Sequence, residues 1–188
     1  MASTTLDGLL ARCDTLDLGC GLAKHPGAFG VDHDPLVAPD LVHDLDAHPY
    51  PLPSGHFQTV ICQDVLEHVG DIGRFLGEIH RIAAPGAVVR IRTPHFSSWY
   101  AYNDPTHRHV LGYFALDRFT AESGLPRRVP LFRYRRRKIL FSRLLRMTGI
   151  AFLANAFPAR YEQLFAFTFP AENLCIELEV VKGPAGSP

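Results

Sequence analysis

The chain has 188 residues, of which 47% are apolar and 20% charged, and its acidic and basic side chains balance to a formal net charge of zero. This length allows one domain with a sizeable core and is too short for two. The longest charge-free apolar stretch, residues 147–159, is shorter than the roughly 18 residues of a membrane span, and the N-terminus lacks the features of an export signal. We therefore expect one cytoplasmic domain over residues 1–182 and a disordered tail, 183–188.

Short apolar runs alternate with turn-forming residues through the first half of the chain. This alternation predicts parallel strands joined by crossovers, in an α/β fold. Only nine residues separate the first run from the second, and nine the second from the third, whereas a crossover helix needs a dozen or more. We expect both connections to leave one flank of the sheet thinly covered. The predicted strands are residues 15–18, 28–31, 41–42, 59–62 and 87–91.

Three later segments have recognisable patterns. Apolar residues recur at helical spacing over 72–82, after a capping residue, Asp71, and before the Pro85-Gly86 pair, which predicts a helix there. Residues 115–122 suit a short helix that ends at Gly124. Alternation over residues 174–181 predicts a final strand.

A basic region follows. Residues 1–122 carry 15 acids and 8 bases, whereas residues 123–161 contain ten bases and no acid. We interpret about 126–170 as a basic-apolar insertion that covers the thin flank or the mouth of the site. It could meet an anionic lipid surface, an anionic substrate or RNA, or form a solvated face with an apolar underside. Its interleaved residues are mostly aliphatic, which favours lipid or an apolar pocket over nucleic acid.

The sharpest motif is Thr15-Leu-Asp-Leu-Gly-Cys-Gly, an apolar strand that runs into a glycine turn, with an acid, Asp32, at the end of the next strand. Glycines let the backbone approach a ligand closely, and a carboxylate can accept two hydrogen bonds from a ribose diol. A nucleotide-type cofactor is therefore expected. A dinucleotide fingerprint would need glycine at position 24, where the chain has Lys24, so a nicotinamide oxidoreductase is the less favoured alternative.

Together with later segments, this motif resembles the class I S-adenosylmethionine-dependent methyltransferases, within the small-molecule group that includes the ubiquinone and menaquinone methyltransferases. The resemblance covers about residues 13–122. It implies a Rossmann-like sheet of seven strands, mostly parallel with an antiparallel last strand, and S-adenosylmethionine as the methyl donor. The later segments are His43-Asp-Leu, Pro51-Leu-Pro-Ser-Gly-His-Phe, Gln63-Asp-Val-Leu-Glu-His-Val and Glu78-Ile-His-Arg-Ile-Ala-Ala-Pro-Gly-Ala.

The resemblance also implies which residues bind the cofactor. The glycine turn would contact the methionine part, Asp32 the ribose and Asp44 the adenine amino group, with Gln63 nearest the methionine end. The implied cofactor-binding residues are Asp17, Gly19, Cys20, Gly21, Asp32, His33, Asp44, Leu45 and Gln63.

The loop over residues 93–109 emerges where ligands bind in open α/β sheets, so we expect it to wall the pocket of a small-molecule acceptor. His95, Tyr100 and His107 are candidate catalytic bases, although positioning the acceptor in line with the sulfonium methyl can supply most of the acceleration. Glu67 and His68 are expected to fix their own loop through hydrogen bonds.

We expect no metal site. Asp104, His107 and His109 are expected to belong to a hydrogen-bonded loop shaped by Pro105. The alternative is that these three residues share a divalent ion. The four cysteines form no CxxC pair, which indicates neither a disulfide framework nor a zinc knuckle. The rival function is a catalytically silent module that binds the cofactor and acts through its basic insertion. The many polar and aromatic groups of the 95–109 loop favour an enzyme.

Overall fold

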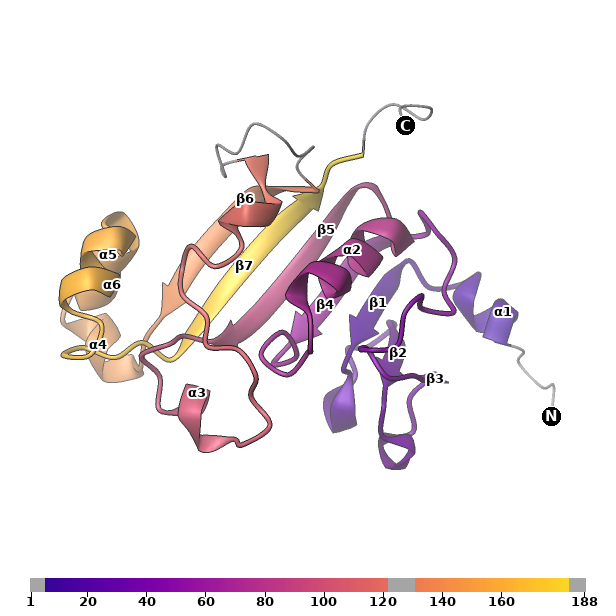
Figure 1. Ribbon diagram of the computed structural model, residues 1–188, viewed down its shortest axis with the longest axis horizontal. Helices are drawn as coiled ribbons and strands as arrows, with labels where there is room; N and C mark the ends of the chain where they lie inside the picture. Colours follow the sequence, from indigo (N-terminus) through magenta and orange to yellow (C-terminus); the bar gives the residue numbers. More distant parts are fainter. Residues whose placement is uncertain (1–5, 122–130, 183–188) are drawn as a thin grey trace.

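A computed structural model describes residues 6–121 and 131–182. The chain forms a seven-stranded sheet in the order β3-β2-β1-β4-β5-β7-β6 (Figure 1). Strands β1 to β5 pair in parallel, and β7 runs antiparallel to both β5 and β6. The sequence-based expectation of a mostly parallel sheet with an antiparallel last strand is confirmed. The strands are β1 (Thr15–Leu18), β2 (Phe29–Asp32), β3 (Leu41–Val42), β4 (Phe57–Gln63), β5 (Ala83–Pro94), β6 (Phe132–Leu140) and β7 (Asn173–Val180).

One amphipathic helix, α2, packs on the centre of the sheet (Figure 1). It spans Ile72–Ile82, as its apolar spacing predicts, and buries Phe75, Leu76, Ile79 and Ile82. The Asp71 side chain caps it by accepting hydrogen bonds from the backbone N–H groups of residues 73 and 74. The other helices are α1 (Leu6–Leu10), α3 (Tyr100–Asn103), α4 (Arg143–Met147), α5 (Ile150–Ala156) and α6 (Pro158–Leu164).

The first two connections are short, as expected. Each contains a single 3-10 turn in place of a crossover helix: η1 (Gly21–Ala23) after β1 and η2 (Pro35–Val37) after β2. The helices α4 to α6 lie at the β6 end of the sheet, far from β1 to β3 (Figure 1). The expectation that this region covers the thin flank is therefore wrong. Its alternative, a place near the site, fits better, because Glu162 of α6 contacts the loop after β5.

Part of the expected basic insertion is a strand of the sheet. Phe132–Leu140 forms β6, which pairs with β7 and buries Phe132 and Ile139. The sequence analysis did not predict this strand, because its run of arginines lacks the apolar pattern of a buried strand. A strand at the edge of a sheet has no neighbour on one side, so its long basic side chains can extend into water. The segment between β6 and β7 therefore holds only the helical part of the predicted insertion.

The second half differs from the predictions in one further element. In place of a helix over 115–122, the structure has a single 3-10 turn, η3 (Asp117–Phe119), and Thr120 then bridges to Phe132 of β6. The proposed end of that helix, Gly124, lies outside the described residues. All four cysteines are free. Within residues 6–121 and 131–182, no helix has both the length and the apolar character required to cross a membrane.

Candidate functional site

A pocket of about 470 Å³ opens at the carboxyl ends of β1, β2 and β4. This edge is where ligands bind in open α/β sheets. The residues around it come from the glycine turn, the end of β2, the segment after β3, the turn after β4 and the loop after β5. Those of its lining residues that sequence analysis assigned to a cofactor are Gly19, Asp32, His33, Asp44 and Leu45.

The glycine turn is held close to the sheet. Gly19 has φ +65° and donates a backbone hydrogen bond to the carbonyl of Val31 at 2.8 Å. A Cβ atom at this position would collide with Val65, so only glycine fits. Gly21 also has a positive φ, +50°, but nothing lies within 4 Å of the place a Cβ would take. The backbone at Gly21 is therefore open to the approach of a ligand.

Two buried carboxylates fix this turn. Asp32 accepts hydrogen bonds from the N–H of Gly21 at 2.9 Å and of Asp34 at 3.0 Å, one on each oxygen. Asp17 accepts one from the N–H of His25 at 2.8 Å, and burial raises the pKa of Asp17. Asp32 also borders the pocket, whereas Asp17 is 5% exposed and acts as an internal anchor for residues 19–25.

Two of the implied cofactor residues, Cys20 and Gln63, are not among the residues that line this pocket. Cys20 is buried, which raises the pKa of its thiol, and its Sγ atom lies beside Gly30. Gln63 is exposed at the end of β4. The next residue, Asp64, borders the pocket and has a left-handed backbone, φ +55°. The sequence analysis assigned the place nearest the methionine end of the cofactor to Gln63. The strained backbone of Asp64 is visible only in the structure.

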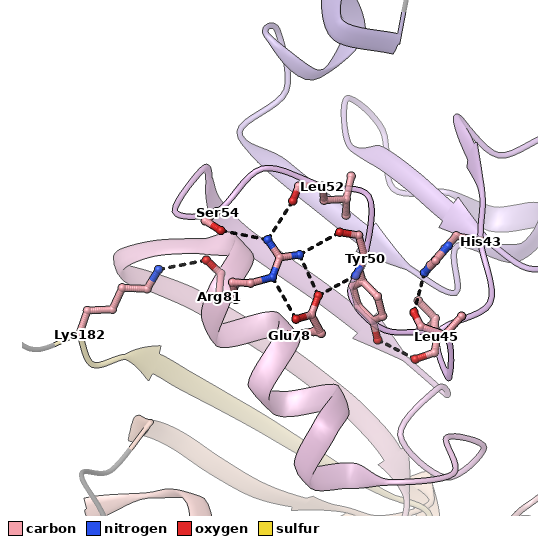
Figure 2. A network of polar contacts seen from close by, with 9 residues as sticks. His43, Leu45, Tyr50, Leu52, Ser54, Glu78, Arg81 and Lys182 are labelled. Carbon is pink, nitrogen blue, oxygen red and sulfur yellow. Dashed lines mark hydrogen bonds and ion pairs between the residues drawn. The ribbon is translucent and has the colours of Figure 1, made fainter. Parts of the chain in front are cut away.

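A network of polar contacts holds Leu45 in place (Figure 2). Leu45 and Asp44 line the pocket. The Tyr50 hydroxyl donates to the carbonyl of Leu45 at 2.9 Å, and the Tyr50 N–H donates to Glu78 Oε2 at 2.7 Å. Arg81 donates to both oxygens of Glu78 at 2.8 and 2.9 Å and also reaches the carbonyl of Tyr50. The loop after β3 is thereby tied to helix α2. Sequence analysis missed this role of Glu78 and Arg81, whose i, i+3 spacing is its visible signal.

A second pocket of about 760 Å³ adjoins the first, and Asp64 and His68 line both. Two of the predicted acceptor-side residues, Tyr100 and His107, line it. Arg92 also lines it and forms an ion pair with Asp64. This pocket combines two histidines, acids and a tyrosine beside the first one, so a second molecule bound here would lie next to a ligand in the first.

His95, the third candidate base, does not line this pocket. Its side chain is 0% exposed. Nδ1 accepts a hydrogen bond from the N–H of Ser97 at 3.1 Å, and Nε2 therefore donates to Glu162 of α6 at 3.2 Å. These contacts give His95 an anchoring role between the loop after β5 and the helical segment, and its catalytic role stays a prediction.

The members of the alternative metal set, Asp104, His107 and His109, are held by hydrogen bonds. His109 Nε2 lies 2.8 Å from the carbonyl of Val69, and one carboxylate oxygen of Asp104 accepts hydrogen bonds from both the N–H and the hydroxyl of Thr106. These contacts agree with a hydrogen-bonded loop, which the sequence analysis set against the metal alternative. Glu67 and His68 do fix their surroundings, since the Glu67 carbonyl accepts from the N–H groups of Arg108 and His109, and His68 Nδ1 lies 2.9 Å from the Thr106 hydroxyl.

Comparison with known proteins agrees with this geometry. Residues 16–91 match a family model described as a methyltransferase domain. This range holds β1 to β4, α2 and most of β5, and therefore the glycine turn, Asp32 and Asp44. No curated protein matches the sequence.

Solved structures match nearly the whole chain. An S-adenosylmethionine-dependent methyltransferase from Mesorhizobium loti is 19% identical with a TM-score of 0.56, and the match covers 93% of this chain and 100% of that one. A SAM-dependent methyltransferase from Archaeoglobus fulgidus is 18% identical with a TM-score of 0.58, over 93% and 94%. The [4+2]-cyclase SpnF is 14% identical with a TM-score of 0.56, over 95% and 80%. Residues 16–91 thus match a methyltransferase domain, and the chain has the fold of the class I methyltransferases, so the resemblance is confirmed at the level of the fold.

Proposed function

We propose that this methyltransferase domain transfers a methyl group from S-adenosylmethionine to a small acceptor of lipophilic or anionic character. The observation that carries the proposal is the junction of two pockets at Asp64. One is bordered by the glycine turn and Asp32, and the other by Tyr100 and His107. A methyl donor and an acceptor bound in adjoining pockets can meet in line, which is the main requirement of methyl transfer.

In the first pocket, the carboxylate of Asp32 would accept hydrogen bonds from the ribose diol. Asp44 and Leu45 would enclose the adenine, and the open backbone at Gly21 would receive the methionine part. This orientation would direct the sulfonium methyl toward Asp64, which borders both pockets. The names of the Mesorhizobium and Archaeoglobus proteins, both S-adenosylmethionine-dependent methyltransferases, support this choice of cofactor.

In the second pocket, His107 is the favoured group to accept a proton from the acceptor. Its Nδ1 lies 3.1 Å from the carbonyl of Ala101 and must donate to it, so Nε2 carries the lone pair. The guanidinium of Arg92 supplies positive charge on the same wall, and its ion pair with Asp64 neutralises part of this charge. An acceptor with an ionisable hydroxyl or an acidic group suits this combination.

Calorimetric titration tests the cofactor. We expect the protein to bind one molecule of S-adenosylmethionine or of adenosylhomocysteine per chain, both in the first pocket. A protein that binds neither would contradict the proposal. Incubation with a panel of phenolic, quinol and carboxylic acceptors, followed by detection of adenosylhomocysteine, tests turnover. The rival function, a silent cofactor-binding module, is supported by the [4+2]-cyclase, which has the same fold and a different named chemistry. Binding without any adenosylhomocysteine formation would favour it.

A patch on the helical segment suggests a partner of a different kind. Within residues 143–169 the exposed basic side chains are Arg143, Arg146 and Arg160, and the single acid, Glu162, is bonded to His95. Basic and apolar side chains together are typical of surfaces that bind anionic lipid. We include an anionic lipid surface as a proposed partner. The exposed apolar side chains of the patch are Leu144, Met147, Phe152, Leu153, Phe157, Leu164, Phe165 and Phe167.

Sedimentation with phosphatidylserine vesicles tests the lipid proposal. Phe152→Asp should reduce binding severalfold, and the effect of salt should show that charge contributes. Leu36→Asp is the matched control, because Leu36 is 87% exposed on η2, outside the patch. Equal binding by neutral phosphatidylcholine vesicles, or equal losses in both variants, would contradict an anionic lipid partner.

A further inference from the structure

Three side chains from two loops meet at the wall of the second pocket. Glu67 and His68 follow β4, and His107 belongs to the loop after β5. Each offers one ligand atom, and the three atoms lie within 4.8 Å of one another. All three residues line the pocket.

Glu67 carries an unpaired buried oxygen. Its side chain is 2% exposed, and Oε2 accepts a hydrogen bond from the Thr93 hydroxyl at 3.0 Å. Oε1 is buried without a hydrogen-bond partner in the described part of the chain. A carboxylate oxygen removed from water and left without a donor or cation is costly. This oxygen therefore points to a missing cationic partner.

The two histidines are already oriented for a ligand. His107 Nδ1 donates to the carbonyl of Ala101, as described above. The Thr106 hydroxyl donates to Asp104 at 2.6 Å, so His68 Nδ1, at 2.9 Å from the same hydroxyl oxygen, acts as a donor to it. No hydrogen bond between described residues occupies Nε2 of either ring. Metal-binding histidines usually have this arrangement, in which one ring nitrogen donates to the protein and the other holds the metal.

We propose that Glu67, His68 and His107 bind a divalent transition-metal ion. Two imidazoles and one carboxylate suit Zn²⁺, Mn²⁺ or Fe²⁺, whereas Mg²⁺ and Ca²⁺ prefer oxygen ligands throughout. Metal–ligand bonds of about 2.0–2.2 Å at tetrahedral angles place ligand atoms about 3.3–3.6 Å apart, so the side chains, whose ligand atoms lie within 4.8 Å of one another, would turn inward to close the site. The sequence predicted no metal site, and its alternative set shares only His107 with this one.

The ion would leave coordination positions open toward the pocket. With the ion bound, the Nε2 lone pair of His107 is no longer free to accept a proton, and the ion takes over this task. An acceptor with a hydroxyl or carboxylate oxygen could occupy an open position, which would hold that oxygen and favour its deprotonated form. This consequence rests on the proposed methyl transfer. The metal site itself stands on the geometry of the three side chains and does not depend on that function.

Titration of chelator-stripped protein with Mn²⁺ and with Zn²⁺ tests the site, by electron paramagnetic resonance for Mn²⁺ and calorimetry for Zn²⁺. We expect one ion per chain. His68→Ala, His107→Ala and Glu67→Gln should each weaken binding at least about tenfold. The matched control is His109→Ala, which removes a histidine two positions from His107 whose ring contacts the carbonyl of Val69. It should retain the parent affinity.

Two results would overturn the proposal: a parent protein that takes up no ion with saturable 1:1 stoichiometry, or an equal loss of affinity in His109→Ala. Circular dichroism of each metal-free variant checks the fold. If Glu67→Gln fails to fold, the two histidine variants still decide, since their side chains are only partly buried. Binding of S-adenosylmethionine to the metal-free parent is measured separately, so failure of the metal site and failure of the proposed function give different results.

Discussion

Arg108 Nη1 lies 2.8 Å from Asp46 Oδ2, although 62 positions separate the two residues. The other oxygen of Asp46 accepts a hydrogen bond from the N–H of Gly70 at 2.7 Å. Asp46 therefore joins the segment after β3, the turn before α2 and the loop after β5. Asp46 and Arg108 both line the proposed cofactor pocket, so this contact links the adenine side of the site to the loop that carries His107.

Arg108→Ala should weaken S-adenosylmethionine binding about threefold to tenfold and leave the thermal transition nearly unchanged. The side chains of Arg108 and Asp46 are 58% and 36% exposed, and an exposed ion pair adds little to stability. Calorimetric titration and thermal melts measure the two quantities. Arg74→Ala removes another exposed arginine, which pairs with Asp71, and should leave affinity unchanged. Equal affinity in Arg108→Ala and the parent would show that the loop is held by other contacts.

Asp32→Asn should weaken S-adenosylmethionine binding by about 1.5–3 kcal/mol, the usual range for hydrogen bonds to a charged group. The apo protein should also lose stability, because the N–H groups of Gly21 and Asp34 lose a charged acceptor that is 7% exposed. Asp14→Asn, at the opposite end of β1, is the control. Cofactor affinity equal to that of the parent would exclude Asp32 as the ribose acceptor.

The Glu78–Arg81 contact should make stability depend on acid pH. Hydrogen bonds from Arg81 hold the pKa of Glu78 below its ordinary value of 4.5. A carboxyl whose pKa is lower in the folded state contributes stability above its unfolded pKa, and this contribution is lost as pH falls through the folded pKa. Urea unfolding from about pH 7 down to about pH 3 should therefore show a smaller decline in Glu78→Gln than in the parent. Parallel curves would contradict this origin of the acid sensitivity.

His95 and His107 should separate by phenotype. His95→Ala removes a fully buried ring that is bonded to Glu162 and should lower the free energy of unfolding by about 1–3 kcal/mol. His107→Ala should retain most of the stability and lower kcat once an acceptor is known. Denaturant unfolding and steady-state kinetics measure the two effects. A stable His95→Ala protein without turnover would support the catalytic role that the sequence predicted.

Neighbouring arginines of β6 should also differ. Arg137 lies over the ring of Tyr134 at 3.8 Å and pairs with Asp117 at 2.6 Å, so Arg137→Glu should destabilise the protein by about 2 kcal/mol or more. Arg136 is exposed, and Arg136→Glu should change stability by less than about 0.5 kcal/mol. Thermal melts of the two variants make the comparison. Equal melting temperatures would mean that the Arg137 contacts contribute nothing.

The sequence by itself determined the features that depend on local chain chemistry. The apolar run at Thr15–Leu18, the glycines after it and Asp32 predicted a cofactor turn, because strand pattern, positive φ and carboxylate placement are properties of a short segment. Helix α2 was predicted from its apolar spacing and its Asp71 cap. The short first crossovers followed from counting residues between runs.

The tertiary structure alone decided which distant residues meet. It placed a run of arginines in β6, which pairs with β7. The register of this pairing determines which side chains of β6 are buried. It buried His95 against Glu162, 67 positions away, and it brought Glu67 and His68 to His107. Contacts of this kind depend on how loops from separate strands pack at one edge of the sheet, and no pattern within a single segment contains that information.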